Sequence, residues 1–195
     1  MNESAYYSYH SSPVGDLLLI SDGEALTGLH LPQHDGTPAP LPETGTAGRR
    51  DDRAFRDVRD QLRTYFAGER FAFDFPMRMA GTPFQRLAWS GLLTIPFGAT
   101  VSYAEQARRI GRPGSSRAVG SANGKNPIAI VVPCHRVIGS NGSLIGYGGG
   151  LDLKRWLIEH EASVLDDQTR RASASRVGEK RNSLRGIVPN RQSSG

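Results

Sequence analysis

The spacing of apolar residues changes partway along this chain of 195 residues, and that change limits the folds open to it. Short apolar or alternating runs at 6–10, 17–21 and 25–31 are separated by turn residues, a pattern that predicts strands. From about residue 80 onward the apolar residues recur mainly at helical spacing. We therefore predict an α+β fold, with an α/β part over 1–79 and a mostly helical part over 80–162.

Three further segments complete the first part. Apolar residues at helical spacing predict a helix over 53–67, which ends before Gly68. The alternating phenylalanines of 71–75 predict one more strand. Residues 32–50 are rich in Pro, Gly and Thr, so we expect a long exposed loop there.

The second part contains two short predicted helices in succession. A helix begins after Thr82 and ends near 96–98. Ser102 and Glu105 have the spacing of a capping box, which predicts the start of a short helix that ends near residue 110. A glycine-containing turn at 111–114 separates it from a helix over 116–123. This order is that of a helix-turn-helix, although many such hairpins bind nothing.

The C-terminal third of the chain divides into a periodic and an aperiodic segment. A helix over 151–161 places Leu153, Trp156, Leu157 and His160 on one apolar face. Residues 163–195 are polar, with scattered Arg and Ser and almost no apolar period, so we predict a disordered basic tail.

Charge is distributed unevenly about the formal net value of +5. By count of Lys, Arg, Asp and Glu, residues 1–79 carry −4, residues 80–162 carry +5 and residues 163–195 carry +4. We infer that a polyanion would meet the middle segment. The alternative is an unevenly charged solvated surface without a partner.

Cys134 is the only cysteine, which excludes an internal disulfide, a CxxC pair and a zinc site of several cysteines. No membrane-length apolar run or signal peptide is visible, so we expect a reduced, cytoplasmic protein with no membrane contact. A lone cysteine is usually a small buried hydrophobe. Here Pro133 precedes it, His135 follows it, and a basic neighbour favours the nucleophilic thiolate.

The residues around this cysteine identify a family. The run 133–137, PCHRV, preceded by Asn126-Pro127, resembles the signature of the O6-alkylguanine-DNA alkyltransferases. The resemblance extends over 81–161 and includes 96–98, 102–103, 117–120, 146–150 and 156–161. It implies an N-terminal ribonuclease H-like domain and a winged helix-turn-helix domain that carries the active-site cysteine.

The resemblance implies direct-reversal DNA repair in a single turnover. The damaged nucleotide flips out, and Cys134 takes the alkyl group from O6 of guanine, or O4 of thymine, and keeps it. His135 accepts the thiol proton through a water, and Glu161 orients that histidine. Tyr103 donates to N3 of the departing guanine, and Asn126 holds the helix-turn-helix and cysteine segments together.

The resemblance also implies contacts with double-stranded DNA containing O6-alkylguanine, with self-association on that DNA and with neither cofactor nor metal. Arg117 takes the place of the flipped base. The expected DNA-contacting residues are Arg117, Tyr103, Ser102, Ala118, Ser121, Ala122, Asn123 and Arg136. The expected pocket residues are Val137, Tyr147, Gly148 and Lys154.

Three other functions compete with alkyl transfer. A protein that recognises and flips alkylated bases without transfer would lack the cysteine, which is present here. A helix-turn-helix regulator would need side chains that read base edges, and the segment 118–122 offers mainly small ones. A cysteine hydrolase would need turnover and an oxyanion hole. The mass of the protein after incubation with methylated DNA separates these possibilities.

Overall fold

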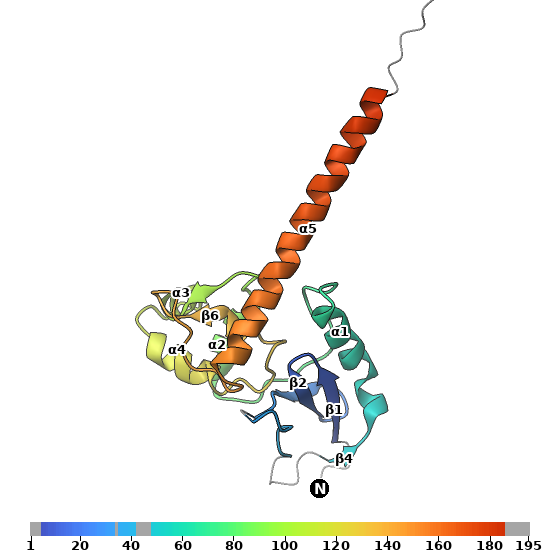
Figure 1. Ribbon diagram of the computed structural model, residues 1–195. Coiled ribbons are helices and arrows are strands. Elements are labelled where there is room, and N and C mark those ends of the chain that lie inside the picture. Colours follow the sequence, from blue (N-terminus) through green and yellow to red (C-terminus); the bar gives the residue numbers. More distant parts are fainter. Residues whose placement is uncertain (1–4, 34, 42–47, 186–195) are drawn as a thin grey trace, which may run out of the picture.

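The computed structural model describes residues 5–33, 35–41 and 48–185, with side chains as far as residue 173. A sheet and a helix form one side of the molecule, a group of short helices forms the other, and a long C-terminal helix projects from between them (Figure 1). In chain order the elements are β1 (Tyr6–Ser12), β2 (Gly15–Ser21), β3 (Leu26–His30), β4 (Arg49–Arg50), η1 (Asp52–Phe55), α1 (Arg56–Phe66), α2 (Pro83–Leu92), β5 (Val101–Ser102), α3 (Tyr103–Arg109), α4 (Ser116–Asn123), η2 (Cys134–Arg136), β6 (Val137–Ile138) and α5 (Leu151–Arg185).

The first part is a sheet with strand order β3-β2-β1-β4. The predicted strands and the predicted helix over 53–67 are confirmed, the latter as η1 followed by α1. Alternation along β2 sends Leu17 and Leu19 into the main core and Leu18 and Ile20 into a smaller cluster on the other face. Within the described residues of the expected loop 32–50, a strand occurs that the sequence does not predict: β4, which pairs in parallel with Tyr6 and Tyr7 of β1.

The strand predicted over 71–75 is wrong. Residues 71–75 form no ladder, and the first pairing in this region is an isolated bridge between Met77 and Leu26. The phenylalanines instead pack on other rings: Phe73 lies 5.5 Å from Tyr65, and Phe71 lies 4.8 Å from Phe97, between ring centroids. Aromatic packing against a helix produced an alternation that imitates a strand.

The second part confirms the predicted helices. Thr82 forms a full capping box at the start of α2. Ser102 caps α3 by accepting from the Glu105 amide, but the Glu105 carboxylate pairs with Arg108 and Arg109 instead of completing a box. The turn before α4 needs the positive φ of Gly111 and Gly114. The remaining two strands, β5 and β6, pair in parallel.

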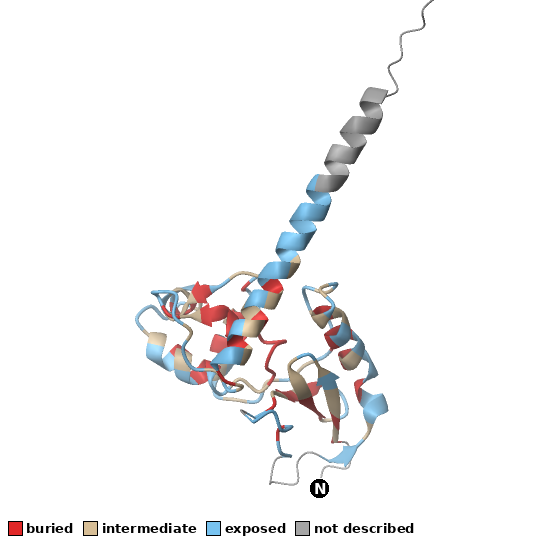
Figure 2. Cartoon of the chain, in the orientation of Figure 1, coloured by how far each residue is buried: buried red, intermediate tan, exposed pale blue. Residues whose placement is uncertain are grey.

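One hydrophobic core joins the two parts. Buried residues gather where the sheet, the short helices and the base of α5 meet (Figure 2). The apolar run 128–132 forms no strand but is buried throughout. Its backbone is tied to β3, since Leu29 donates to the Pro127 carbonyl and accepts from the Ala129 amide. The segment that leads into Cys134 is therefore anchored on the N-terminal sheet.

The disordered tail expected over 163–195 is corrected for residues 163–185, which continue α5 as helix. Starting a helix is the costly step, and the packed turns of 151–161 have already made it, so further residues add at little cost without an apolar face. Asp167 and Arg170 form an ion pair one turn apart on this extension. Residues 186–195 lie outside the described part of the chain. Within the described residues, no helix has the length and apolar character needed to span a membrane.

Candidate functional site

Cys134 opens the short helix η2 and is 9% exposed. Its Sγ accepts a hydrogen bond from Asn126 Nδ2 at 3.2 Å. The same nitrogen donates to the Val132 carbonyl at 2.7 Å, and Asn126 Oδ1 accepts from the Ile128 amide. The Asn126 side chain thus ties the stretch that follows α4 to the cysteine segment. Burial raises the pKa of the Cys134 thiol, so the thiol is protonated at neutral pH and needs a base.

His135 is a neutral histidine of defined tautomer. The side chain is fully buried, and its Nε2 lies 2.9 Å from Glu161 Oε1. An ionised carboxylate only accepts hydrogen bonds, so Nε2 carries the hydrogen and Nδ1 carries the lone pair. Burial lowers the pKa of His135, while Glu161 acts in the opposite direction. Its Nδ1 has no partner among the described residues, which leaves it free to accept a proton.

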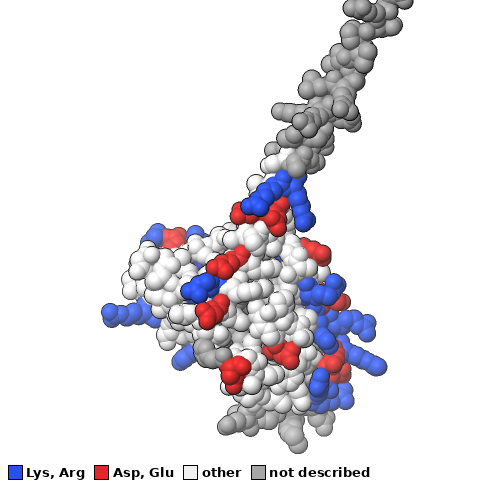
Figure 3. Space-filling model, in the orientation of Figure 1, with Lys and Arg blue, Asp and Glu red and all other residues white. Residues whose placement is uncertain are grey.

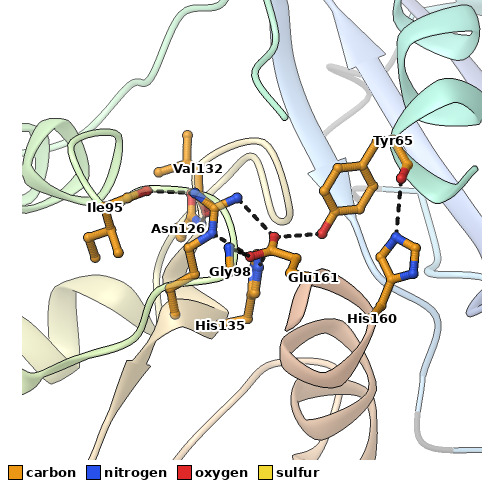
Figure 4. A network of polar contacts seen from close by, with 9 residues as sticks. Tyr65, Ile95, Gly98, Asn126, Val132, His135, His160 and Glu161 are labelled. Atoms are coloured by element: carbon orange, nitrogen blue, oxygen red, sulfur yellow. Dashed lines mark hydrogen bonds and ion pairs between the residues drawn. The ribbon is translucent and has the colours of Figure 1, made fainter. Parts of the chain in front are cut away.

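Glu161 is the centre of a buried polar network (Figure 4). Its Oε1 accepts from His135 Nε2, from Arg136 Nη2 at 2.8 Å and from Tyr65 Oη at 2.8 Å. Its Oε2 accepts from Arg136 Nε and from the Gly98 amide, both at 2.9 Å. Although burial opposes ionisation, the hydrogen bond and charge interaction with His135 and those with Arg136 hold the pKa of Glu161 far below its ordinary value. The carboxylate is therefore a permanent anion.

Three residues expected at the DNA surface are buried, which corrects that prediction. Arg136 is 6% exposed, because it pairs with Glu161 and donates to the Ile95 carbonyl at 2.6 Å. Asn123 exchanges two hydrogen bonds with the buried Gln106. Ala122 is 3% exposed and accepts from the Trp89 indole through its carbonyl. Asn123 thus joins α4 to α3, Ala122 joins α4 to α2, and Arg136 joins η2 to α5.

The residues predicted to line a substrate pocket lie in and around the glycine-rich loop before α5. Tyr103 Oη and Lys154 Nζ both donate to the Ile145 carbonyl, at 3.0 and 2.8 Å. Burial raises the pKa of Tyr103 and lowers that of Lys154. Val137 is buried in β6 beneath this region, and Gly148 is exposed.

Tyr147 has a buried hydroxyl without a partner in the described part of the chain. Burial, then the nearby Cys134 sulfur, raises the pKa of Tyr147 well above its ordinary value. This hydroxyl and His135 Nδ1 are the only such orphaned side-chain atoms among the described residues. Unmet hydrogen-bonding capacity in a native interior usually belongs to a water or a substrate atom. Here it is confined to the neighbourhood of the cysteine.

The exposed face of α4 presents Arg117, Ala118 and Ser121. The Arg117 guanidinium has no ion pair with any described residue. Ser102, the remaining residue expected there, is half-buried as the cap of α3. The structure thus brings one long cationic side chain onto a helix face of small residues.

Basic residues also gather where the sequence does not predict them. Arginine side chains, with acidic side chains between them, line the edge of the molecule that α1 forms, on the side away from α4 (Figure 3). Four arginines of η1 and α1 border a cavity of about 350 Å³ there: Arg53, Arg56, Arg59 and Arg63. Asp52 and Asp60 border the same cavity and pair with Arg59 and Arg63. No cluster of three or more His, Cys, Asp or Glu suited to a metal ion occurs among the described residues.

Two contributors to the site, Tyr65 and Gly98, were not predicted from the sequence. Tyr65 counted there only as one apolar position of a helix, and its hydroxyl gave no signal. Gly98 was predicted only as part of a turn. In the structure its φ is 74°. Leu165 packs so closely on it that an added Cβ would lie 2.3 Å from Leu165 Cδ1. Glycine is required there both for the turn and for that contact.

Fold and site together define a class: a helix-turn-helix protein in which a buried cysteine is followed by a buried histidine that is hydrogen-bonded to a carboxylate. Family models match both the N-terminal and the helical part of the chain. Residues 5–79 match "6-O-methylguanine DNA methyltransferase, ribonuclease-like domain", and residues 83–163 match "6-O-methylguanine DNA methyltransferase, DNA binding domain".

Individual relatives agree with the family models. The chain is 49% identical over 158 residues to the methylated-DNA–protein-cysteine methyltransferase of Mycobacterium tuberculosis, covering 81% of this chain and 93% of the relative. It is 44% identical over 158 residues to the protein of that name from Methanosarcina acetivorans, covering 81% and 99%. A crystal structure of Mycobacterium tuberculosis OGT in complex with DNA matches with a TM-score of 0.74 and 48% identity, over 82% of this chain and 94% of that one. The chain therefore belongs to the 6-O-methylguanine DNA methyltransferase family, whose members repair DNA by moving an alkyl group to a cysteine.

Proposed function

We propose that this protein removes the alkyl group from O6 of alkylguanine, and from O4 of alkylthymine, in double-stranded DNA and keeps it on Cys134. The observation that carries the proposal is a buried thiol next to a neutral histidine whose Nδ1 is unpartnered among the described residues. The family membership and the relatives' names support the same reaction.

The reaction needs a base for the thiol. His135 Nδ1 takes the thiol proton through a water, and Glu161 stabilises the resulting imidazolium through Nε2. The thiolate attacks the alkyl carbon, so a sulfur–carbon bond forms while the carbon–oxygen bond breaks. The bond's electron pair passes to the guanine, and the resulting anion takes up a proton from solvent while His135 releases the one it received, which leaves the repaired neutral base in the DNA.

A donor near the departing base makes that step easier, because expelling an anion is costly. Tyr103 fills this role at guanine N3. In the structure its hydroxyl donates to the Ile145 carbonyl, a bond it exchanges for one to the base. Lys154 keeps its own bond to that carbonyl and so holds the loop in place during the exchange.

DNA meets the exposed face of α4. Small side chains at Ala118 and Ser121 let the helix backbone approach closely, and Arg117 enters the stack in place of the flipped nucleotide. This face reads little sequence, which suits lesions that arise anywhere. Self-association along the DNA remains a prediction.

Each molecule acts once, since a thioether offers no easy route to hydrolysis. Intact-protein mass spectrometry after incubation with methylated duplex DNA tests this. We expect a gain of one methyl group, located on Cys134. An unchanged mass with free methanol would indicate hydrolysis, and an unchanged mass with tight lesion binding would indicate recognition without transfer.

A further inference from the structure

Tyr65 reaches the candidate alkyl-transfer site from the other part of the molecule. It lies on α1, is fully buried, and its hydroxyl donates to Glu161 Oε1 at 2.8 Å across 96 positions of sequence. Figure 4 shows its phenol pointing at the Glu161 carboxylate. Among described residues before position 80, it is the only one with a hydrogen bond to this carboxylate.

The tyrosine is held firmly as a donor. Burial and then the Glu161 charge raise the pKa of Tyr65 well above its ordinary value, so the hydroxyl keeps its hydrogen. Its ring lies 5.5 Å from Phe73 and 5.9 Å from Phe97, between centroids. Its backbone carbonyl also contacts His160 Nε2, one residue before Glu161, at 3.1 Å. The hydroxyl and the carbonyl of one residue thus hold α5 at Glu161 and His160.

The hydroxyl shares its acceptor atom with the histidine base. Glu161 Oε1 accepts from Tyr65 and from His135 Nε2 at once. A hydrogen bond to a charged acceptor is strong and draws on the negative charge that would otherwise stabilise protonated His135. Glu161 favours the protonation of His135, whereas burial, Arg136 and Lys154 oppose it. The hydrogen bond from Tyr65 also opposes the protonation of His135, because it weakens the attraction of Glu161 for the proton.

We propose that Tyr65 is a positioning residue for alkyl transfer, through which the N-terminal part of the chain orients Glu161 and keeps His135 neutral and ready to accept the thiol proton. This inference rests on the proposed function for its role, but the effect of Tyr65 on His135 through Glu161 can be tested without any transfer. It gives the ribonuclease-like domain a part in the reactivity of Cys134, exercised through Glu161 and His135.

The test compares two substitutions that each remove one tyrosine hydroxyl. Tyr65→Phe keeps the packed ring and deletes the donor to Glu161. Tyr9→Phe is the matched control, because Tyr9 lies in the same domain and donates only to the Ala39 carbonyl, at 3.2 Å. The single-turnover rate of transfer from free O6-benzylguanine, which needs no base flipping, is measured against pH for both variants and the unmodified protein.

Without the Tyr65 hydroxyl, Glu161 attracts the His135 proton more strongly. We expect the acid limb of the rate profile to move up by about 0.5–1 pH unit in Tyr65→Phe and to stay in place in Tyr9→Phe. ¹⁵N NMR titration of His135 in the same three proteins should give the same shift. Coincident profiles and titrations for all three proteins would overturn the proposal.

A double-mutant cycle locates the effect. In Glu161→Gln the acceptor is uncharged, so adding Tyr65→Phe should shift the His135 titration no further. An equal shift in both backgrounds would mean that the hydroxyl acts elsewhere, against the proposal. If Tyr65→Phe does not fold, NMR of the unmodified protein still tests the proposal. A slowly exchanging Tyr65 hydroxyl proton with cross-relaxation to His135 Nε2–H supports the contact, and its absence refutes it.

The two proposals fail separately. If the unmodified protein gains no alkyl group on Cys134, the proposed function fails, while the His135 titrations still report on Tyr65. If the unmodified protein is alkylated and Tyr65→Phe titrates as it does, only the proposed role of Tyr65 fails.

Discussion

The two sides of His135 differ in how completely their polar atoms are satisfied. On the Nε2 side, Glu161 accepts five hydrogen bonds from four residues and is 1% exposed. On the Nδ1 side, neither Nδ1 nor the buried Tyr147 hydroxyl has a partner among the described residues. The first side is already arranged before substrate arrives, which is how a site stabilises developing charge without reorganising. The second side has capacity left for a water and a base.

The largest effect on alkyl transfer is expected from a substitution on the Nδ1 side of His135, where polar atoms lack partners. Cys134→Ser should abolish alkyl transfer, because a hydroxyl is a far weaker nucleophile than a thiolate. DNA binding should persist, since α4 is untouched. Intact mass after incubation with methylated duplex measures the first, and a binding titration measures the second. Normal methylation of the serine variant would refute the assignment of the nucleophile.

The Nε2 side of His135, where Glu161 accepts its hydrogen bonds, is expected to contribute most to the stability of the fold. Glu161→Ala removes the partner of the buried Arg136 and should cost about 3–5 kcal/mol in free energy of unfolding. Denaturant unfolding measures this. Glu159→Ala, an exposed glutamate on the same helix, is the matched control and should change stability by less than about 0.5 kcal/mol. Similar decreases in both would show that the network contributes nothing specific.

Acid should weaken the network around Glu161 over a defined range of pH. The folded pKa of Glu161 lies far below its ordinary value of 4.5, so its ionisation stabilises the fold fully above that value. The contribution declines as pH falls below about 4.5 toward the folded pKa. We expect the stability difference between the unmodified protein and Glu161→Ala to shrink across this range. A difference independent of pH would contradict a permanently ionised Glu161 at the centre of the network.

Arg117→Ala should separate base flipping from chemistry. We expect transfer from duplex DNA to slow by about 10-fold or more, the scale of a few kcal/mol of unstacking left uncompensated. Transfer from free O6-benzylguanine should be nearly unchanged. Arg63→Ala, an exposed arginine on α1, is the control for removal of one positive charge. Equal slowing with both substrates would show that Arg117 does not replace the flipped base.

The smallest effect is expected from shortening α5. Truncation after Asp167 keeps Leu165 on Gly98 and removes seven basic residues. Fold and transfer should survive, and any decrease in DNA affinity should diminish as salt rises. The log–log salt slope should fall by about 0.9 for each DNA phosphate that the removed residues neutralise, and we expect roughly one to three such phosphates. Identical affinity and slope in both proteins would exclude DNA binding by this segment.

Truncation after Ala162 provides the contrast. It also removes Leu165, whose side chain packs on the glycine that donates to Glu161. We expect this shorter protein to be less stable than the one that ends at Asp167. Equal thermal midpoints would show that the packing of Leu165 on Gly98 does not support the network.

Local sequence predicted the elements and the reactive atom. The strands β1–β3 and the helices α1–α4 follow from apolar spacing, caps and glycine turns, all of which act within a few residues. The errors have equally local origins. Alternating phenylalanines imitated a strand at 71–75, and the lack of an apolar face hid the continuation of α5 beyond residue 162.

The sequence by itself determined the single nucleophile, its PCHRV surroundings and the helix-turn-helix beside it, since these are features of neighbouring residues. Only the tertiary structure decided which side chains complete the site. Arg136, which was expected to contact DNA, donates instead to the buried Glu161. Tyr65, which also donates to Glu161, lies 96 positions away from it in the sequence. A buried carboxylate must find donors wherever the fold brings them, and that requirement leaves no periodic trace along the chain.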